Sequence, residues 1–462
     1  MSQTVYLSRQ GETALIEIDN PPVNALSQSV RAGLLDAVKQ AEADPSIKVI
    51  AVMGRGKVFI AGADIKEFGK PPQSPILPDV IATLEQSTKA VIAVLHGVAL
   101  GGGLEVALGC HYRVALNDTR LGLPEVKLGL LPGAGGTQRL PRLTGLATAA
   151  DWITRGKLVD AQTALSAGLI DAISDADSAQ EAALAVARQW QEGRIALRKT
   201  GALPNPRDDS HIIEHARQQL LDECPELYSP FRILEALEAS CILPLAEGLT
   251  RERELFFQCM DSPQRAGLIH HFFASKAISK VPGAEGPSRI TSAVVSGEHS
   301  VVKALAGQPL VERSESGSPG MKVWLASDDN KIADTPVTVT FLDPDSAQSD
   351  VVGDFSLLLI PDSQWAELID HGAQPGVHQA LLNLLKSSGL SIIPTKQRSL
   401  YRALKDNTKT SESDRTALET AALSSWEGGL CYRGSDIDVL AIETLGYPKH
   451  MGGPHYQATL SK

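Results

Sequence analysis

The order of strand-like and helix-like segments constrains the fold of this chain most. Over roughly the first 175 residues, short β-rich runs alternate with helical segments, whereas residues 180–280 show helical spacing alone. The alternation predicts an α/β domain, and its end predicts a separate helical region. A length of 462 residues agrees with several folding units, because one domain commonly holds about 100–200 residues.

A few segments carry the N-terminal alternation. Residues 14–18 alternate as a half-buried strand does, and residues 49–53 form a continuous apolar strand. Residues 27–42 place apolar side chains at helical spacing. The apolar run 91–95 leads through a glycine cluster into a helix predicted over residues 102–110.

The later part of the chain is helical first and mixed afterwards. The predicted helices cover residues 179–192, 211–221, 230–238, 245–260 and 265–279. Residues 281–287 and 314–320 have the Pro, Gly and Ser content of linkers. Strands are predicted over residues 321–325, 337–341 and 351–360, and a helix over residues 376–388. These patterns leave the topology of the C-terminal part open.

Charge and hydropathy exclude two classes of partner. The chain has 43 Lys and Arg against 54 Asp and Glu, a net charge of −11, and no dense basic run, so nucleic acid is not an expected partner. The longest apolar stretch, residues 90–108, contains His96, Glu105 and several glycines, which predicts no membrane span. No secretory signal is visible either, so a cytoplasmic location is expected by elimination.

The cysteines and histidines give no sign of a metal or disulfide site. Five cysteines, at positions 110, 224, 241, 259 and 431, lie far apart without a CxxC pair, which argues against a disulfide framework or a thiolate zinc site. His96 and His111 stand on either side of the glycine cluster and its helix, where packing is the favoured interpretation. No HExxH pattern accompanies them.

Two glycine-containing loops hold most of the chemical information. The first is Phe59 to Ile65, and the second is Leu100 to Glu105, whose three glycines precede an apolar helix. Helix N-termini and glycine turns offer unpaired N–H donors, and two such donors from separate loops would form an oxyanion hole. The alternative is that both loops are only tight strand-to-helix turns. Neither fits GxGxxG or GxxxxGK[ST], so phosphate binding is not specifically indicated.

Two glutamates near these loops are candidates for acid and base chemistry. Glu105 lies at the start of the apolar helix, and Glu125 lies 20 residues further on, so only tertiary folding could bring them together. In a shared apolar pocket, desolvation and like charge would raise at least one pKa. The alternatives are a helix-dipole carboxylate for Glu105 and a solvated loop charge for Glu125.

Three motifs resemble the crotonase superfamily of enoyl-CoA hydratases and isomerases. They are Phe59 to Lys66, Val91 to Glu105, and Leu123 to Arg142, and they match that family's signatures in order and spacing. The resemblance implies a crotonase-type ββα spiral α/β domain. It also implies that Ala63 and Gly102 supply the oxyanion-hole N–H groups.

The same resemblance implies the remaining site residues. Glu105 and Glu125 fall at the catalytic carboxylates of enoyl-CoA hydratases. The residues expected to line the substrate are Asn24, Ala25, Leu26, Ala61, Gly62, Asp64, Ile65, Gly101, Pro124 and Gly133. The implied reaction adds water to C3 of a 2-trans-enoyl-CoA in fatty acid β-oxidation, with Δ3-Δ2 isomerisation as a second activity. Which glutamate is the base and which the acid is left open.

The second half resembles parts of a multifunctional β-oxidation enzyme. Residues 180–280 are similar to its helical linker, and residues 427–439 and 445–454 are similar to the helical domain of 3-hydroxyacyl-CoA dehydrogenases. Residues 281–330 contain no GxGxxG, although a dinucleotide site needs that turn. We therefore expect a shortened dehydrogenase remnant.

The expected division of the chain follows from these similarities. It is a hydratase domain over residues 1–180, a helical linker over 181–282, a degenerate Rossmann-like region over 283–395, and a helical dehydrogenase-like region over 396–462. No cofactor is expected, because acyl-CoA is the substrate and NAD binding is in doubt. A homo-oligomer and a thiolase partner are left open. The alternatives are a bifunctional enzyme with an active NAD-dependent dehydrogenase and a non-catalytic acyl-CoA-binding scaffold.

Overall fold

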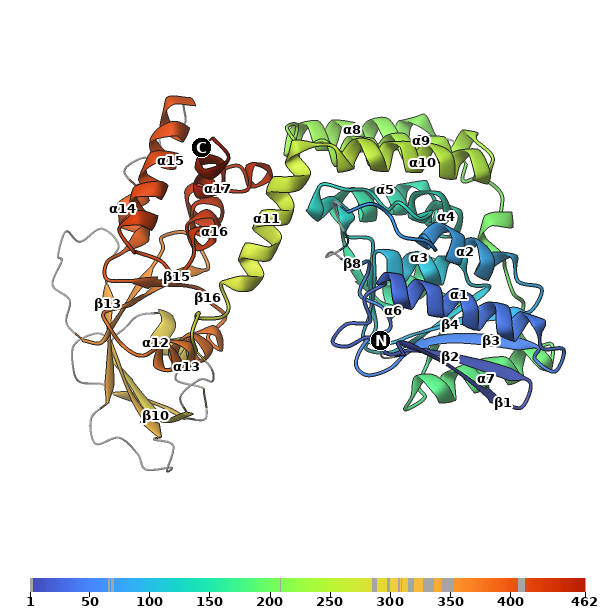
Figure 1. The fold of residues 1–462 in the computed structure, drawn as a ribbon, viewed down its shortest axis with the longest axis horizontal. Coiled ribbons are helices and arrows are strands. Elements are labelled where there is room, and N and C mark those ends of the chain that lie inside the picture. The colour runs from blue at the N-terminus through green and yellow to red at the C-terminus, as the bar shows by residue number, and fades with distance from the viewer. Residues whose placement is uncertain are drawn as a thin grey trace. The chain divides into compact units, whose positions relative to one another are not determined.

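The chain folds into two compact units, residues 1–265 and 266–462 (Figure 1). The computed structural model describes residues 3–64, 67, 70–207, 209–284, 289–296, 300–305, 308, 310–314, 320–326, 336–342, 353–405 and 412–461. None of the helices in these ranges combines the length and apolar character that a membrane crossing requires.

A six-stranded sheet forms the centre of the N-terminal unit. Its strands, in spatial order, are β1 (Val5–Gln10), β2 (Thr13–Ile18), β3 (Val49–Gly54), β4 (Ala90–Leu95), β6 (Tyr112–Leu116) and β9 (Ala172–Ser174). The first two strands form an antiparallel hairpin, and the other neighbours are parallel. A smaller sheet contains β5 (Val98–Leu100), β7 (Arg120–Gly122) and β8 (Leu158–Asp160). The strands predicted near residues 14, 49 and 91 are all present.

Both faces of the large sheet are covered, which explains its continuous apolar strands. On β3, Ile50 and Val52 pack in the core formed with α1 (Gln28–Ala43), α2 (Leu77–Gln86) and α3 (Gly102–Gly109). The alternate residues Val49 and Ala51 pack on the opposite face, against α7 (Ala179–Gln191). The period of two in a strand therefore divides each apolar run between two cores.

Most of the helical region predicted as a linker packs on the N-terminal core. Its helices are α8 (Ser210–Glu223), α9 (Ser229–Ile242) and α10 (Leu245–Met260). In Figure 1 they lie over α4 (Gly136–Thr144) and α5 (Leu146–Arg155), with which they are in contact. Leu220, Ile233 and Leu255 from the three helices belong to the same buried cluster as α3. By contacts, residues 181–265 thus belong to the first unit, whereas the sequence divides the chain at residues 181 and 283.

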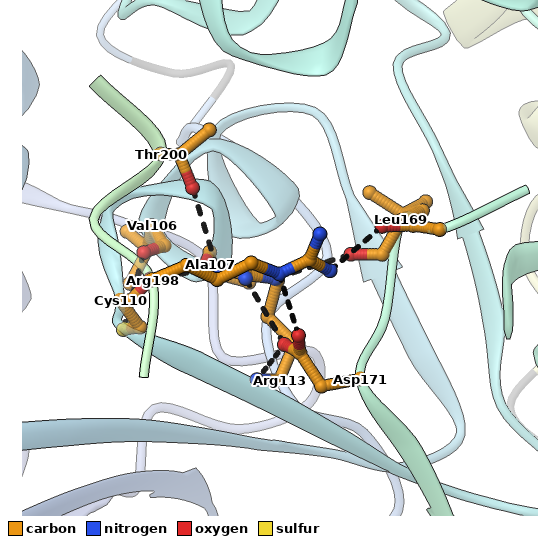
Figure 2. A network of polar contacts seen from close by, with 9 residues as sticks. Val106, Ala107, Cys110, Arg113, Leu169, Asp171, Arg198 and Thr200 are labelled. Carbon is orange, nitrogen blue, oxygen red and sulfur yellow. Dashed lines mark hydrogen bonds and ion pairs between the residues drawn. The ribbon is translucent and has the colours of Figure 1, made fainter. Parts of the chain in front are cut away.

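A buried arginine ties the end of α3 to distant segments (Figure 2). Arg113, on β6, is fully buried and forms an ion pair with Asp171 at 3.0 Å. Its guanidinium donates to the carbonyl of Cys110 at 2.6 Å and to that of Leu169 at 3.1 Å. Arg198 binds the other oxygen of Asp171 at 2.7 Å. The network therefore holds the C-terminal end of α3, the helix that carries Glu105.

A seven-stranded mixed sheet forms the centre of the C-terminal unit. In spatial order its strands are β11 (Val311–Ser314), β10 (Arg289–Ser296), β12 (Gly320–Ala326), β13 (Val337–Leu342), β14 (Phe355–Leu359), β15 (Trp365–Asp370) and β16 (Ser391–Lys396). Its helices are α11 (Pro263–Ala277), α12 (Ser300–Leu305), α13 (Pro375–Lys386), α14 (Leu400–Lys405), α15 (Glu412–Glu427), α16 (Gly434–Leu445) and α17 (Pro454–Leu460).

The unit is α/β followed by helices, as the sequence predicts, but its sheet differs from a dinucleotide-binding sheet. The pairs β10/β12, β12/β13 and β14/β15 are antiparallel, and the pairs β10/β11, β13/β14 and β15/β16 are parallel. A Rossmann sheet is mostly parallel, because helical crossovers join its strands. The expected Rossmann-like character therefore extends to the α/β composition and not to the strand directions. Part of the strand predicted over residues 351–360 is β14, and residues 351–352 lie outside the described residues.

Buried carboxylates in the C-terminal unit bind helix N-termini. Glu367 is fully buried and accepts hydrogen bonds from the Leu400 N–H at 2.5 Å and from the hydroxyls of Ser399 and Thr395. Asp438 is also fully buried and accepts from the first turn of α17, at the N–H of His455, at 2.8 Å. These contacts satisfy the free N–H groups of α14 and α17. Both carboxylates therefore have a role in the fold.

Candidate active site

Two loops of the N-terminal unit bring the expected oxyanion donors together. Leu26 pairs with Ala63 in a parallel bridge and donates to the Gly62 carbonyl at 2.9 Å. The second loop is joined to the first by a hydrogen bond from the Leu100 N–H to the Ile60 carbonyl at 3.0 Å. A Cβ atom added to Gly102 would lie 3.7 Å from the Ala63 nitrogen.

The N–H groups of Ala63 and Gly102 are suited to binding an external oxygen. Gly102 is the first residue of α3, where an N–H has no partner within the helix. Among the described residues, neither N–H donates to a protein acceptor. Two adjacent unpaired donors, one at a helix N-terminus, match the requirement for stabilising a developing oxyanion.

The glycines at 101 and 103 are required because neighbouring groups leave no room for a Cβ atom. Gly101 has a φ of +52°, and a Cβ at this position would lie 2.9 Å from Oε1 of Glu125. A Cβ at Gly103 would lie only 2.3 Å from the Ile60 carbonyl oxygen. Side chains here would push the two loops apart and displace Glu125. The glycines therefore serve the geometry of the site as well as the turn.

Glu105 is buried in the first turn of α3 and is held by backbone donors. Its exposed fraction is 3%, and its Oε1 accepts hydrogen bonds from the N–H groups of Ala134 at 2.7 Å and Gly136 at 2.9 Å. Burial raises the pKa of Glu105, while these N–H groups and the nearby Arg139 and Arg253 act in the opposite direction. The carboxylate is thus oriented by the turn before α4.

Glu125 begins the short 3-10 helix η2 (Glu125–Leu128), directly after β7. Its Oε1 lies beside Gly101, and its Oε2 is buried with no hydrogen-bond partner among the described residues. Burial, followed by the charge of Glu105, raises the pKa of Glu125 well above its usual value. The fold therefore brings the two predicted glutamates into electrostatic contact, which favours the protonated form of Glu125.

A third carboxylate at the site, Glu252, has no counterpart among the predicted residues. It lies on α10, is 1% exposed, and accepts hydrogen bonds from the Gly135 N–H at 2.6 Å and the Thr137 N–H at 2.9 Å. Burial and the charge of Glu105 raise the pKa of Glu252 to about 8. The sequence signal is its position on the buried stripe of α10, between Gly248 and Leu255 at helical spacing.

Asn24 lies beside the site, but its side chain forms hydrogen bonds with backbone groups of the protein. Its φ is +52°, its Nδ2 donates to the carbonyls of Arg55 and Val58 at 2.9 Å, and its Oδ1 accepts from the Asn20 N–H at 2.9 Å. The side chain is 2% exposed. Asn24 thus positions the strand-to-loop segment that leads to Ala63, and its described contacts are within the protein.

The other residues expected to contact substrate flank the two loops. The partly exposed ones are Ala25, Ala61, Asp64, Pro124 and Gly133, and the buried ones are Leu26, Gly62 and Gly101. Ile65 lies outside the described residues. Within the described part of the chain, no group of three His, Cys, Asp or Glu side chains is placed to hold a metal ion.

Comparison with known proteins supports the resemblance read from the motifs. Residues 8–203 match the family model described as enoyl-CoA hydratase/isomerase. The chain is 41% identical over 271 residues to the peroxisomal bifunctional enzyme of Danio rerio, covering 58% of this chain and 37% of that protein. It is 38% identical over 288 residues to the peroxisomal bifunctional enzyme of Homo sapiens, covering 61% and 39%. The chain therefore spans about two fifths of the length of these relatives.

Among solved structures, the enoyl-CoA hydratase of Bacillus anthracis is similar. It is 26% identical, with a TM-score of 0.39, and the match covers 59% of this chain and 96% of that one. The family match confirms that the N-terminal part of the chain carries an enoyl-CoA hydratase/isomerase domain of the crotonase type.

Proposed function

From the match of residues 8–203 to the enoyl-CoA hydratases and isomerases, we propose that the N-terminal unit hydrates 2-trans-enoyl-CoA to 3-hydroxyacyl-CoA in fatty acid β-oxidation. The observation that carries this proposal is the buried Oε2 of Glu125, which has no partner among the described residues and lies near the charge of Glu105. A buried polar atom without a partner is costly unless a ligand or water binds it. A substrate water between two carboxylates would satisfy it.

In this mechanism the thioester oxygen binds the N–H groups of Ala63 and Gly102. As water adds to C3, negative charge develops on that oxygen, and the two fixed donors stabilise it. The positive end of α3 adds to the effect at Gly102. These donors need no reorganisation during the reaction, since neighbouring backbone contacts already hold both loops.

The two glutamates divide the proton transfers. Glu105 accepts two N–H groups and lies near Arg139 and Arg253, all of which favour its ionised form, so we assign it as the base that activates the water. The Oε2 of Glu125 has no described donor, and the pKa of Glu125 is raised well above its usual value, so we assign it as the acid that supplies a proton to C2. Overall, the OH of water adds to C3 and a proton adds to C2, and transfer of the proton that Glu105 took from water back to Glu125 restores both carboxyl groups.

The test is an absorbance assay with crotonyl-CoA and a long-chain 2-enoyl-CoA side by side. If the proposal holds, the full chain causes loss of the conjugated enoyl absorbance with at least one of the two substrates. Glu125→Gln should lose nearly all turnover while keeping its fold. Undiminished turnover in that variant would rule out the two-carboxylate mechanism, and an inactive wild-type chain would favour the acyl-CoA-binding scaffold.

A second reaction, Δ3-Δ2-enoyl-CoA isomerisation, is favoured by the same pair of glutamates. A carboxylate beside a protonated carboxyl can move a proton from C2 to C4 of a 3-enoyl thioester without water. Supplying a 3-enoyl-CoA and following the appearance of the conjugated product would measure this activity separately from hydration.

We further propose that the C-terminal unit lacks NAD-dependent dehydrogenase activity, although relatives carry the name bifunctional enzyme. Two observations support this proposal. From the start of β10 to the end of α12 the sequence contains a single glycine, Gly297. The described sheet also contains both parallel and antiparallel strand pairs. A pyrophosphate needs a close backbone approach that several glycines provide. Formation of NADH from 3-hydroxybutyryl-CoA and NAD would overturn this proposal.

The cellular location is open to the same kind of test. The relatives are named peroxisomal, and some are named glyoxysomal, so we propose a peroxisomal location in place of the cytoplasmic one expected from sequence. Imaging of the tagged full-length protein against a peroxisomal marker would separate the two. Association with a thiolase and formation of a homo-oligomer stay predictions.

A further inference from the structure

We propose that Glu252, on α10, is a positioning residue for Glu105, so that the helical segment after residue 203 completes the active site. This inference rests on the proposed hydratase function. Glu252 and Glu105 bind opposite sides of one short turn, Ala134 to Thr137, at the N-terminus of α4. Glu252 itself makes no described contact with either oxyanion donor.

The turn presents its N–H groups alternately to the two carboxylates. The N–H groups of Ala134 and Gly136 donate to Oε1 of Glu105 at 2.7 and 2.9 Å. Those of Gly135 and Thr137 donate to the two oxygens of Glu252 at 2.6 and 2.9 Å. Each carboxylate therefore fixes the turn from its own side. Loss of Glu252 would free two donors and let the turn move relative to Glu105.

The hydroxyl of Thr137 makes the attachment of Glu252 specific. It lies 2.5 Å from Oε2 of Glu252 and accepts a hydrogen bond from Nε2 of Gln138 at 3.0 Å. The Thr137 hydroxyl donates its proton to Glu252 while it accepts from Gln138, so it links the two side chains. Gln138 also donates to the Ala236 carbonyl at 2.8 Å, which ties the turn to α9.

Glu252 also acts on the glutamates through its charge. The charged groups around it are Glu105 on α3, Glu125 on η2 and Arg253 on α10, while Arg139 on α4 faces Glu105. On α9, Glu235 pairs with Arg251. When Glu252 ionises, its negative charge opposes loss of the proton from Glu125. The carboxylate thus helps to keep the acid protonated at higher pH.

The central experiment is Glu252→Gln in the full-length protein, with kcat and KM for crotonyl-CoA hydration measured from pH 5 to pH 10. We expect kcat to fall on the order of 10- to 100-fold, because small misplacements of a reacting group carry penalties of this size. KM should change little, since Glu252 is not among the residues expected to bind substrate. The alkaline limb of the pH profile should move to lower pH, because Glu125 loses its proton more easily without the neighbouring charge.

The matched control is Glu254→Gln on the same helix, where the side chain is 57% exposed and pairs with Arg251. It removes the same charge from the surface and should leave kcat and the pH profile unchanged. If Glu252→Gln does not fold, as judged by circular dichroism, Thr137→Val and Thr137→Ser replace it. The valine should shift the alkaline limb in the same direction by a smaller amount, and the serine should restore the wild-type profile.

The outcomes separate this inference from the proposed function. A wild-type protein without hydratase activity would refute the proposed function itself. An active wild type would overturn the positioning role if a folded Glu252→Gln keeps the wild-type kcat, or loses kcat with no change in the pH profile. The same conclusion would follow if Thr137→Val and Thr137→Ser behave alike.

Discussion

The two units of this protein bury carboxylates in different ways. In the C-terminal unit, Glu367 and Asp438 are fully buried, and each accepts hydrogen bonds at the N-terminus of a helix. In the N-terminal unit, Glu125 has a buried oxygen without a described partner and lies close to the charge of Glu105. The carboxylates of Glu367 and Asp438 therefore stabilise the fold, whereas the free buried oxygen of Glu125 is available for chemistry.

The largest expected effect is the loss of hydratase activity when Glu125 or Glu105 is neutralised. Glu125→Gln and Glu105→Gln should each lower kcat on the order of 100- to 10,000-fold, because each removes one proton transfer. Steady-state absorbance assays with crotonyl-CoA measure this. Glu223→Gln, at a side chain that is 54% exposed, is the control and should keep wild-type turnover. Equal activity in Glu125→Gln and the control would remove the contrast between the two units.

Replacement of Arg113 should show the opposite pattern, in stability rather than catalysis. Arg113→Met leaves the Asp171 carboxylate without its buried partner, which costs about 3–5 kcal/mol in comparable cases. Denaturant unfolding of the N-terminal unit measures the loss. The control Arg155→Met breaks a partly exposed pair with Glu223 and should cost about 1 kcal/mol or less. An unchanged midpoint in Arg113→Met would show that the network in Figure 2 does not hold α3.

Glu367→Ala tests the C-terminal side of the comparison. It removes the acceptor for the Leu400 N–H and for the hydroxyls of Ser399 and Thr395, and should cost about 1–3 kcal/mol of unfolding free energy. Hydration of crotonyl-CoA should be unchanged. Thermal unfolding and kcat are measured on the same preparation. If Glu367→Ala loses as much kcat as Glu125→Gln, the presence of hydrogen-bond partners does not distinguish structural from catalytic buried carboxylates.

A further expected effect is a pH dependence of stability. The pKa of Glu252 is about 8 in the folded unit, above its ordinary value of 4.5, because of burial and the charge of Glu105. Between these values the folded state binds a proton that the unfolded chain releases, so stability falls as pH rises from about 4.5 through 8. Melting temperatures should decline over this range in the wild type and less in Glu252→Gln. Parallel pH curves would contradict the raised pKa.

The sequence predicts the N-terminal fold well because its signals are local. The apolar runs near residues 49 and 91 and the glycines at 101–103 give strand, turn and helix with boundaries close to the observed ones. The pairing of Glu105 with Glu125 depends on tertiary folding, since 20 residues separate them, and it follows from the family resemblance rather than from periodicity. The 3-10 helix that holds Glu125 has no strong local pattern.

Two features exceed what local patterns can give. Glu252 lies 115 residues beyond Thr137, and only the packing of α10 on α4 brings the two together. The sequence pattern of the predicted linker therefore does not show that Glu252 belongs to the site. In the C-terminal unit, strand composition indicates a sheet, but strand direction depends on long-range pairing. The mixed order of β10 to β16 is therefore visible only in the structure.

The most direct test of the central claim is the protonation state of Glu125. Difference infrared spectra between the wild type and Glu125→Gln, recorded at pH 7, report the carbonyl band of a protonated carboxyl group. If Glu125 is the acid, the wild type carries a protonated-carboxyl band that Glu125→Gln loses, while Glu367→Gln leaves that band in place. A wild-type spectrum in which Glu125 contributes only ionised carboxylate bands would contradict its assignment as the acid.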